Sequence, residues 1–183
     1  MTDADAVRRV ALPLPRAVER QTGGRWKHYV GQIVFLAFAD DEQAIGFGFP
    51  KEQRDDLVAS APGTFFLPPT RDLRFNWVCA RLAPLDDDEM RELVTDAWRM
   101  CVPRMLHDLP DLPAPAAQAW ALIDARDFSG AHPLLHPHLH WQDRDVVLTG
   151  RSSVLAHLRQ VPRPRPPDRV EVRDGQVHRW ERD

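Results

Sequence analysis

The chain has 183 residues, a formal net charge of −3 and 43% hydrophobic residues, a composition that excludes an intrinsically disordered protein. Its length accommodates one medium domain or two small ones, and no segment approaches the roughly 20 apolar residues of a membrane span. The first 110 residues carry 14 basic and 17 acidic side chains, and the remainder carry 10 of each. Neither half therefore has the basic excess expected of a protein that neutralises many phosphates.

Signals for location and redox chemistry are few. Residues 1–5 are acidic and lack the basic-then-apolar order of a signal peptide, so we expect a cytoplasmic protein. Only Lys27 and Lys51 among the 24 basic residues are lysine, and this arginine bias is typical of a GC-rich bacterial genome. Cys79 and Cys101 each lie in an apolar pattern, which predicts two buried free thiols and no disulfide framework.

The first part of the chain predicts a run of strands with helices at both ends. The expected elements are a helix around Asp5–Ala11, strands at Arg25–Val30, Gln32–Ala39 and Ala44–Phe49, a helix at Lys51–Ser60, and extended segments at Thr64–Leu67 and Phe75–Leu82. Four carboxylates from Asp86 to Glu89 then precede an apolar pattern at three- and four-residue steps that ends at Val102. We interpret these carboxylates as the capped first turn of an amphipathic helix, in preference to a metal site.

Two glycines stand out within one expected strand. Gly46 and Gly48 share a face, and Ile45, Phe47 and Phe49 share the opposite one. This pattern predicts that another element, a helix in the simplest case, packs close to the backbone there. A phosphate loop is the weaker interpretation, because no third glycine follows before the next helix.

A proline-rich stretch, Leu109–Pro115, divides the chain. Its three prolines predict an extended connector, so we expect one domain at 1–109, a linker at 110–115 and a second domain at 116–183. The expected elements of the second domain are helices at Ala116–Arg126 and Phe128–Leu135, strands at Leu139–Gln142 and Val146–Thr149, a helix capped by Ser152 or Ser153, an exposed connector at Pro162–Pro167, and a hairpin of Arg169–Arg173 and Gln176–Arg182.

The terminal hairpin carries a clear turn signal. Asp174-Gly175 is a favoured sequence for a two-residue turn. With that turn, Val172 faces Val177 and Glu171 faces His178 across the ladder.

A group of histidines lies near the first expected strand of the second domain. On a regular strand, three of them would share a face and could bind zinc. We expect two prolines to interrupt the segment, so we predict surface histidines and no metal site. The histidines are His132, His136, His138 and His140, and the prolines are Pro133 and Pro137.

Basic and aromatic residues alternate in the first part of the chain, a pattern that can grip a nucleic-acid strand. Strands with an apolar inner face and a solvated basic outer face explain the same pattern. The candidate binding residues are Arg25, Lys27, Arg71, Arg74 and Trp77, with His140 and Trp141 in the second part. No catalytic triad, glycine-rich phosphate loop or paired-cysteine motif is present, and we predict no catalytic residue.

The first part resembles the MmcQ/YjbR family. The segments that carry the resemblance are Arg25–Phe35, Pro50–Leu57, Ala61–Phe66, Trp77–Leu82, Asp87–Leu93 and Ala97–Arg99. The resemblance implies an α+β fold in which helices pack on one antiparallel sheet. Family members are often described as DNA-binding by likeness of that fold to a double-wing module. Residues 67–76 depart from the Thr-Pro-His-Tyr-like segment that is usual in the family.

The second part resembles a shortened SnoaL-like member of the nuclear transport factor two-like superfamily. The segments concerned are Ala125–Phe128, Leu134–Pro137, Leu139–Trp141, Thr149–Arg151 and Val170–Val177. The resemblance implies a short α+β domain with a curved, cone-like sheet and a pocket. No residue of this chain matches the acids that do chemistry in the enzymatic relatives.

These observations predict a non-catalytic binding or interaction protein with no cofactor. Two alternatives stay open: a DNA-binding protein, and a small-molecule binder or weak enzyme that uses a SnoaL-like pocket. A basic surface patch would favour DNA, and an enclosed apolar pocket would favour a ligand. The partners we consider are a weakly bound nucleic acid and a second copy of the chain in a homodimer, and we expect no membrane partner.

Overall fold

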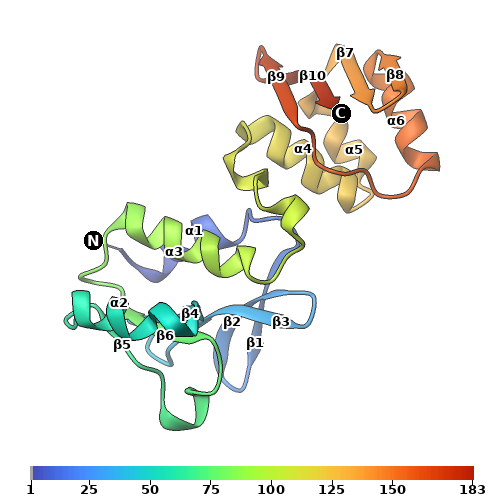
Figure 1. Cartoon of the computed structure of the whole chain (residues 1–183). Coiled ribbons are helices and arrows are strands. Elements are labelled where there is room, and N and C mark those ends of the chain that lie inside the picture. The colour runs from blue at the N-terminus through green and yellow to red at the C-terminus, as the bar shows by residue number, and fades with distance from the viewer. Residues whose placement is uncertain (1) are drawn as a thin grey trace. The chain divides into compact units, whose positions relative to one another are not determined.

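The computed structural model describes residues 2–183 and divides the chain into two units, one that ends at Arg104 and one that begins at Met105 (Figure 1). The proline-rich stretch near this division is not the extended connector that we predicted. Leu109–Asp111 forms a 3-10 turn, and the next helix begins at Ala114 with Pro113 at its N-cap. Proline is tolerated at a helix start because the first N–H groups have no intrahelical acceptor.

The first unit contains a six-stranded antiparallel sheet, which confirms the predicted α+β class. Its elements are α1 (Ala4–Ala11), β1 (Ala17–Thr22), β2 (Arg25–Val30), β3 (Ile33–Phe38), β4 (Ala44–Gly48), α2 (Arg54–Ser60), β5 (Phe65–Phe66), β6 (Trp77–Arg81) and α3 (Asp87–Arg99). The strands follow the order β1-β2-β3-β4-β6-β5. Edge strand β1 has no counterpart among the predicted elements, because its residues are mostly polar and exposed.

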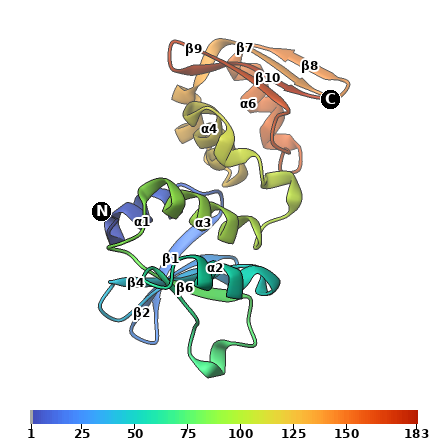
Figure 2. The same cartoon turned by 60° about the vertical axis from the view of Figure 1, so that its left-hand side comes forward.

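Helices α1 and α3 cover one face of this sheet. Figure 2 shows both helices on one side and the long loop between β5 and β6 on the other, and α3 contacts β3 and β4. The carboxylate of Asp86 accepts hydrogen bonds from the N–H groups of Asp88 and Glu89, so the predicted capping of α3 is confirmed. Trp98 on α3 is fully buried, and its Nε1 donates to the carbonyl of Pro15 at 2.9 Å.

An irregularity between β2 and β3 increases the apolar area that faces the helices. His28 pairs with Leu36 and Tyr29 pairs with Val34, so Phe35 is an extra residue in β3. Such a bulge places two consecutive residues on one face. Phe35 and Leu36 are accordingly both fully buried.

The second unit contains three helices and a mixed four-stranded sheet. Its elements are α4 (Ala114–Asp124), α5 (Phe128–Ala131), β7 (Leu135–Asp143), β8 (Val146–Thr149), α6 (Arg151–Gln160), β9 (Arg169–Arg173) and β10 (Gln176–Arg182). The strand order is β8-β7-β10-β9, with β7 and β10 parallel. Trp141 and Trp180 are partners in that parallel pair, and their rings stack in the core at a centroid distance of 4.8 Å.

The terminal hairpin forms as predicted, with one error of register. Asp174 and Gly175 have φ of 52° and 74°, as a two-residue hairpin turn requires, and Val172 pairs with Val177. Glu171, however, pairs with Arg179 and not with His178. The register shifts between Val177 and Arg179, so the prediction of regular alternation fails at this bulge.

Three further expectations for the second unit are wrong. Strand β7 runs through Pro137, although the register of its parallel pairing shifts between Leu135 and His140. Helix α6 begins after Gly150, whose φ of 91° suits glycine, and neither predicted serine is the N-cap. The connector before β9 is not wholly exposed, because Pro164 and Pro167 are buried. Across residues 2–183, no helix has both the length and the apolar character needed to cross a membrane.

Candidate ligand-binding cavity

A row of five residues crosses the sheet of the first unit on the face opposite α1 and α3. Strand register places Lys27 beside Ala37, Ala37 beside Gly46, Gly46 beside Cys79, and Cys79 beside Phe66. The three central side chains are small, and the two at the ends are large. A cavity lies on this part of the face, with the ring of Trp77 in its lining, and we call it the open-face cavity.

The loop between β5 and β6 forms one wall of the open-face cavity. Pro68, Pro69, Asp72 and Phe75 from this loop line a volume of about 730 Å³. The loop is tied to α2, because Nη1 of the buried Arg54 donates to the carbonyl of Leu73 at 3.3 Å.

The indole of Trp77 lies against Gly46. A Cβ atom added at Gly46 would lie 3.0 Å from Cε3 of Trp77, closer than side-chain carbons normally approach. A side chain at this position would push the ring away from the strand by a few tenths of an ångström. The predicted close approach therefore exists at Gly46, but an indole and not a helix makes it. At Gly48 the added atom would lie 3.7 Å from the Ala97 carbonyl of α3, an ordinary contact distance, so a helix lies near this glycine but makes no unusually close approach.

The charges around the open-face cavity are unevenly compensated. Arg25 makes two hydrogen bonds to Asp40, at 2.6 and 3.1 Å, and these lower the pKa of the Asp40 carboxyl. Asp72 is paired with Arg71 at 3.5 Å. Lys27 also lines the cavity, and its ammonium makes no ion pair within the described part of the chain. An anionic group in the cavity would therefore find one positive charge that no carboxylate neutralises.

Cys79 forms part of the cavity floor but is a poor nucleophile. Burial raises the pKa of its thiol to about 11, and the negative charge of Asp72 adds to this effect. The thiolate, which is the reactive form, is therefore scarce at neutral pH. The cavity lining contains no histidine, so no imidazole lies in it to activate the thiol as a general base.

The structure places three of the seven predicted site residues in the cavity lining and two more on the adjoining loop. Arg25, Lys27 and Trp77 line the open-face cavity, and Arg71 and Arg74 belong to the loop that forms its wall. The guanidinium of Arg74 lies 4.7 Å above the ring of Phe75. The remaining two residues lie on β7 of the second unit, and one of them, Trp141, is only 1% exposed.

The histidines of the second unit gather at the bulge of β7 and β10. The rings of His136 and His178 have centroids 4.9 Å apart, and those of His136 and His138 lie 5.7 Å apart. Burial lowers the pKa of His178, so the neutral imidazole is favoured. Within residues 2–183, no group of three or more His, Cys, Asp or Glu side chains is placed to hold a metal ion.

The first unit is thus an α+β domain whose antiparallel sheet has helices on one face and a cavity on the other. Residues 12–100 match the model of the YjbR family, and this unit contains a YjbR-family domain. It is similar in fold to the crystal structure of Deinococcus radiodurans protein DR2400, described as family-model domain DUF419. That match has a TM-score of 0.50 and 15% sequence identity, and it covers 62% of this chain and 91% of that one. No curated protein matches the chain.

Proposed function

We propose that the chain is a non-catalytic binding protein, and that the open-face cavity holds a small, mostly apolar molecule with an anionic group. The observation that carries this proposal is the row of small side chains at the centre of the sheet, with the uncompensated Lys27 at its end. Ile33 and Phe75, two large apolar side chains at the cavity, are 55% and 47% exposed. Apolar walls with a few placed polar groups are typical of ligand pockets, and exposed apolar clusters mark interaction sites.

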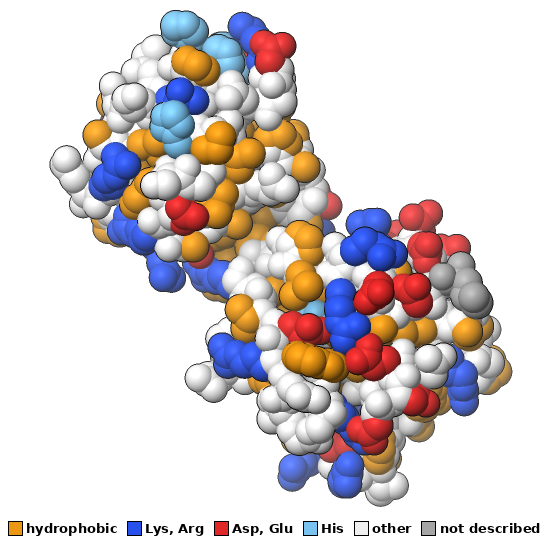
Figure 3. Space-filling view, turned by 180° about the vertical axis from the view of Figure 1, so that it is seen from behind, with side chains coloured by type: hydrophobic (Ala, Val, Ile, Leu, Met, Phe, Trp, Pro, Cys, Tyr) orange, Lys and Arg blue, Asp and Glu red, His pale blue; other side chains and the backbone are white. Residues whose placement is uncertain are grey.

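DNA binding is the weaker alternative. Two of the predicted basic residues already pair with carboxylates, Arg25 with Asp40 and Arg71 with Asp72. On the face shown in Figure 3, Lys and Arg side chains of the first unit lie among Asp and Glu side chains and form no continuous basic field. Sequence-independent binding to a duplex requires many phosphates to be neutralised, so this distribution favours a small ligand.

For the second unit, we keep the proposal of a shortened SnoaL-like domain. Its support is the combination of a short sheet with helices packed on it, since α6 contacts β7 and β8 and α4 contacts β9 and β10. A cytoplasmic location and a homodimer stay predictions from the sequence.

Two fluorescent probes test the open-face cavity. The first, 8-anilino-1-naphthalenesulfonate, carries an anionic sulfonate, and the second, N-phenyl-1-naphthylamine, is an uncharged molecule of similar size. Ala37→Leu fills the hollow row, so we expect it to weaken the binding of both probes. Lys27→Met removes only the charge, and we expect it to weaken the anionic probe by about fivefold, the effect of one partly solvated ion pair, and to leave the neutral probe unchanged.

Lys51→Met is the matched control, because Lys51 is the other lysine of the chain and lies outside the cavity. Urea unfolding of each variant establishes that the fold is retained. If Ala37→Leu destabilises the unit, Phe75→Ser opens the wall instead and should weaken both probes. The proposal would be refuted if each probe bound the folded wild type and the folded cavity variants with the same affinity.

A further inference from the structure

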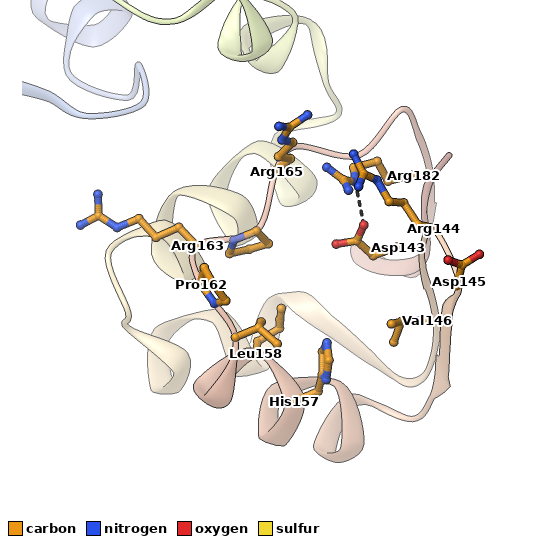
Figure 4. Close-up of a pocket in the computed structure, with 12 residues that line it drawn as sticks. Asp143, Arg144, Asp145, Val146, His157, Leu158, Pro162, Arg163, Arg165 and Arg182 are labelled. Atoms are coloured by element: carbon orange, nitrogen blue, oxygen red, sulfur yellow. Dashed lines mark hydrogen bonds and ion pairs between the residues drawn. The ribbon is translucent and has the colours of Figure 1, made fainter.

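A second cavity, of about 520 Å³, lies wholly within the second unit (Figure 4). Four segments line it: the turn between β7 and β8, the end of α6, the connector at residues 161–165, and Arg182 at the end of β10. We call it the arginine cavity, because four arginines line it, with His157 and only two acidic residues. The arginines are Arg144, Arg163, Arg165 and Arg182, and the acidic residues are Asp143 and Asp145.

Three of these arginines keep guanidinium N–H groups that no carboxylate within residues 2–183 accepts from. Arg182 is held by Asp143, whose Oδ1 accepts from its Nε at 2.7 Å, and its side chain is only 12% exposed. Its two Nη groups make no hydrogen bond within residues 2–183. Arg144 and Arg165 make no ion pair within the same part of the chain. Arg163 differs, because its Nε lies 3.9 Å from Asp124. In Figure 4 its side chain and that of Arg165 both extend away from the other lining residues, so the exposed Arg165 would reach a ligand by turning inward.

The backbone that carries these arginines is held in place by hydrogen bonds. Arg126 donates from Nη1 to the carbonyl of Leu158 at 2.7 Å and from Nη2 to that of Val161 at 2.8 Å, which fixes the start of the connector. The N–H of Arg144 donates to the carbonyl of Arg182 at 2.8 Å, which ties the turn to the end of β10. Prolines in the connector further restrict its backbone. Such preorganisation lowers the entropic cost of binding a ligand.

We propose that the arginine cavity binds a small organic anion through a carboxylate or phosphate group. Guanidinium groups present several N–H donors in a plane, a geometry that matches the oxygens of either group. Val146, Leu158 and Pro162 line the same cavity and provide apolar contact for the body of the molecule. The concentration of positive charge is local, because the chain as a whole has a net charge of −3. This inference does not rest on the open-face cavity.

Calorimetric titration tests the proposal with inorganic phosphate, acetate and benzoate at constant ionic strength. The 183-residue chain with Lys27→Met is used throughout, so that the open-face cavity contributes no unpaired positive charge. Saturable binding is expected, tighter for benzoate than for acetate if the apolar wall is engaged, and phosphate establishes which anionic group is preferred. The double variant Arg144→Gln and Arg165→Gln should weaken binding at least about tenfold, the effect of losing two charge-assisted contacts.

Arg169→Gln is the control for charge, because Arg169 is an exposed arginine of the same unit outside the cavity. It should leave the affinity for all three anions unchanged. Both altered arginines of the double variant are exposed, so the fold should be retained, which far-UV circular dichroism verifies. Absence of saturable binding by all three anions, or equal affinity in the double variant and the control, would overturn the proposal.

Discussion

His28 on β2 should make the first unit less stable as the pH falls below neutrality. Its side chain is fully buried, and neither ring nitrogen has a hydrogen-bond partner within residues 2–183. The ring packs against Phe35 and Phe38, each at a centroid distance of 5.9 Å. This burial lowers the pKa of His28, the nearby charge of Glu19 raises it in part, and that of Arg8 lowers it further.

The direction of the effect follows from proton linkage. Because the folded-state pKa of His28 lies below its ordinary value of 6.5, the unfolded chain binds a proton more readily than the folded chain. The stability that neutral His28 provides is fully present above about pH 6.5 and is lost as the pH falls toward the folded-state pKa. One such group changes the free energy of unfolding by at most about 1.4 kcal/mol per pH unit.

Urea unfolding at pH 7.5, 6.5 and 5.5 measures this effect in the wild type and in His28→Leu. Leucine keeps an apolar side chain between the sheet and the helices and removes the titrating group. We expect the stability advantage of the variant over the wild type to grow between pH 6.5 and 5.5. His178→Gln is the parallel control, because the pKa of His178 is also lowered but its side chain belongs to the second unit. Parallel pH profiles for the wild type and His28→Leu would refute the reasoning.

Three further outcomes follow from the same structure. In a Cys101→Ser background, Cys79 should react with iodoacetamide at pH 8 about 100-fold more slowly than a free cysteine, because a pKa near 11 instead of 9.0 leaves less thiolate. A normal rate would contradict its burial. Gly175→Ala should lower the free energy of unfolding by about 1 kcal/mol, because the φ of 74° strains residues with a Cβ; an unchanged Tm would contradict this. Duplex DNA should bind only weakly at physiological salt, and a salt-sensitive sub-micromolar Kd in a fluorescence titration would favour the DNA-binding alternative.

Elements with strong periodicity could be predicted from the sequence, and elements that depend on their neighbours could not. Helix α3 was predictable because its apolar residues recur at helical spacing behind an acidic cap. Strand β1 was missed because it is a polar edge strand with one apolar branched residue, Val18, that is itself 38% exposed. The pairing of Glu171 was mispredicted because one bulged residue, His178, changes every partner that follows along the ladder.

The open-face cavity also depends on neighbouring strands, so it could not be predicted from the sequence. Lys27 and Trp77 could be named as candidate binding residues because one is charged and the other is aromatic. Ala37, Gly46 and Cys79 have no side-chain chemistry that would mark them as part of a binding site. Their importance comes from the register, which places three small residues from three strands side by side. Alternation of glycine with large apolar residues in β4 was the one sign of a hollow face that the sequence offered.

The small-molecule ligand that we propose would account for the uncovered face of the first sheet. A sheet with helices on one side usually turns polar side chains to water on the other, where they need no cover. Here the central positions on that side hold alanine, glycine and cysteine, which hydrate poorly, and the ring of Trp77 lies against the glycine. The loop between β5 and β6 borders this hollow without filling it, and a volume of about 730 Å³ remains. A mostly apolar ligand with an anionic group would cover the small residues and would place its negative charge beside Lys27.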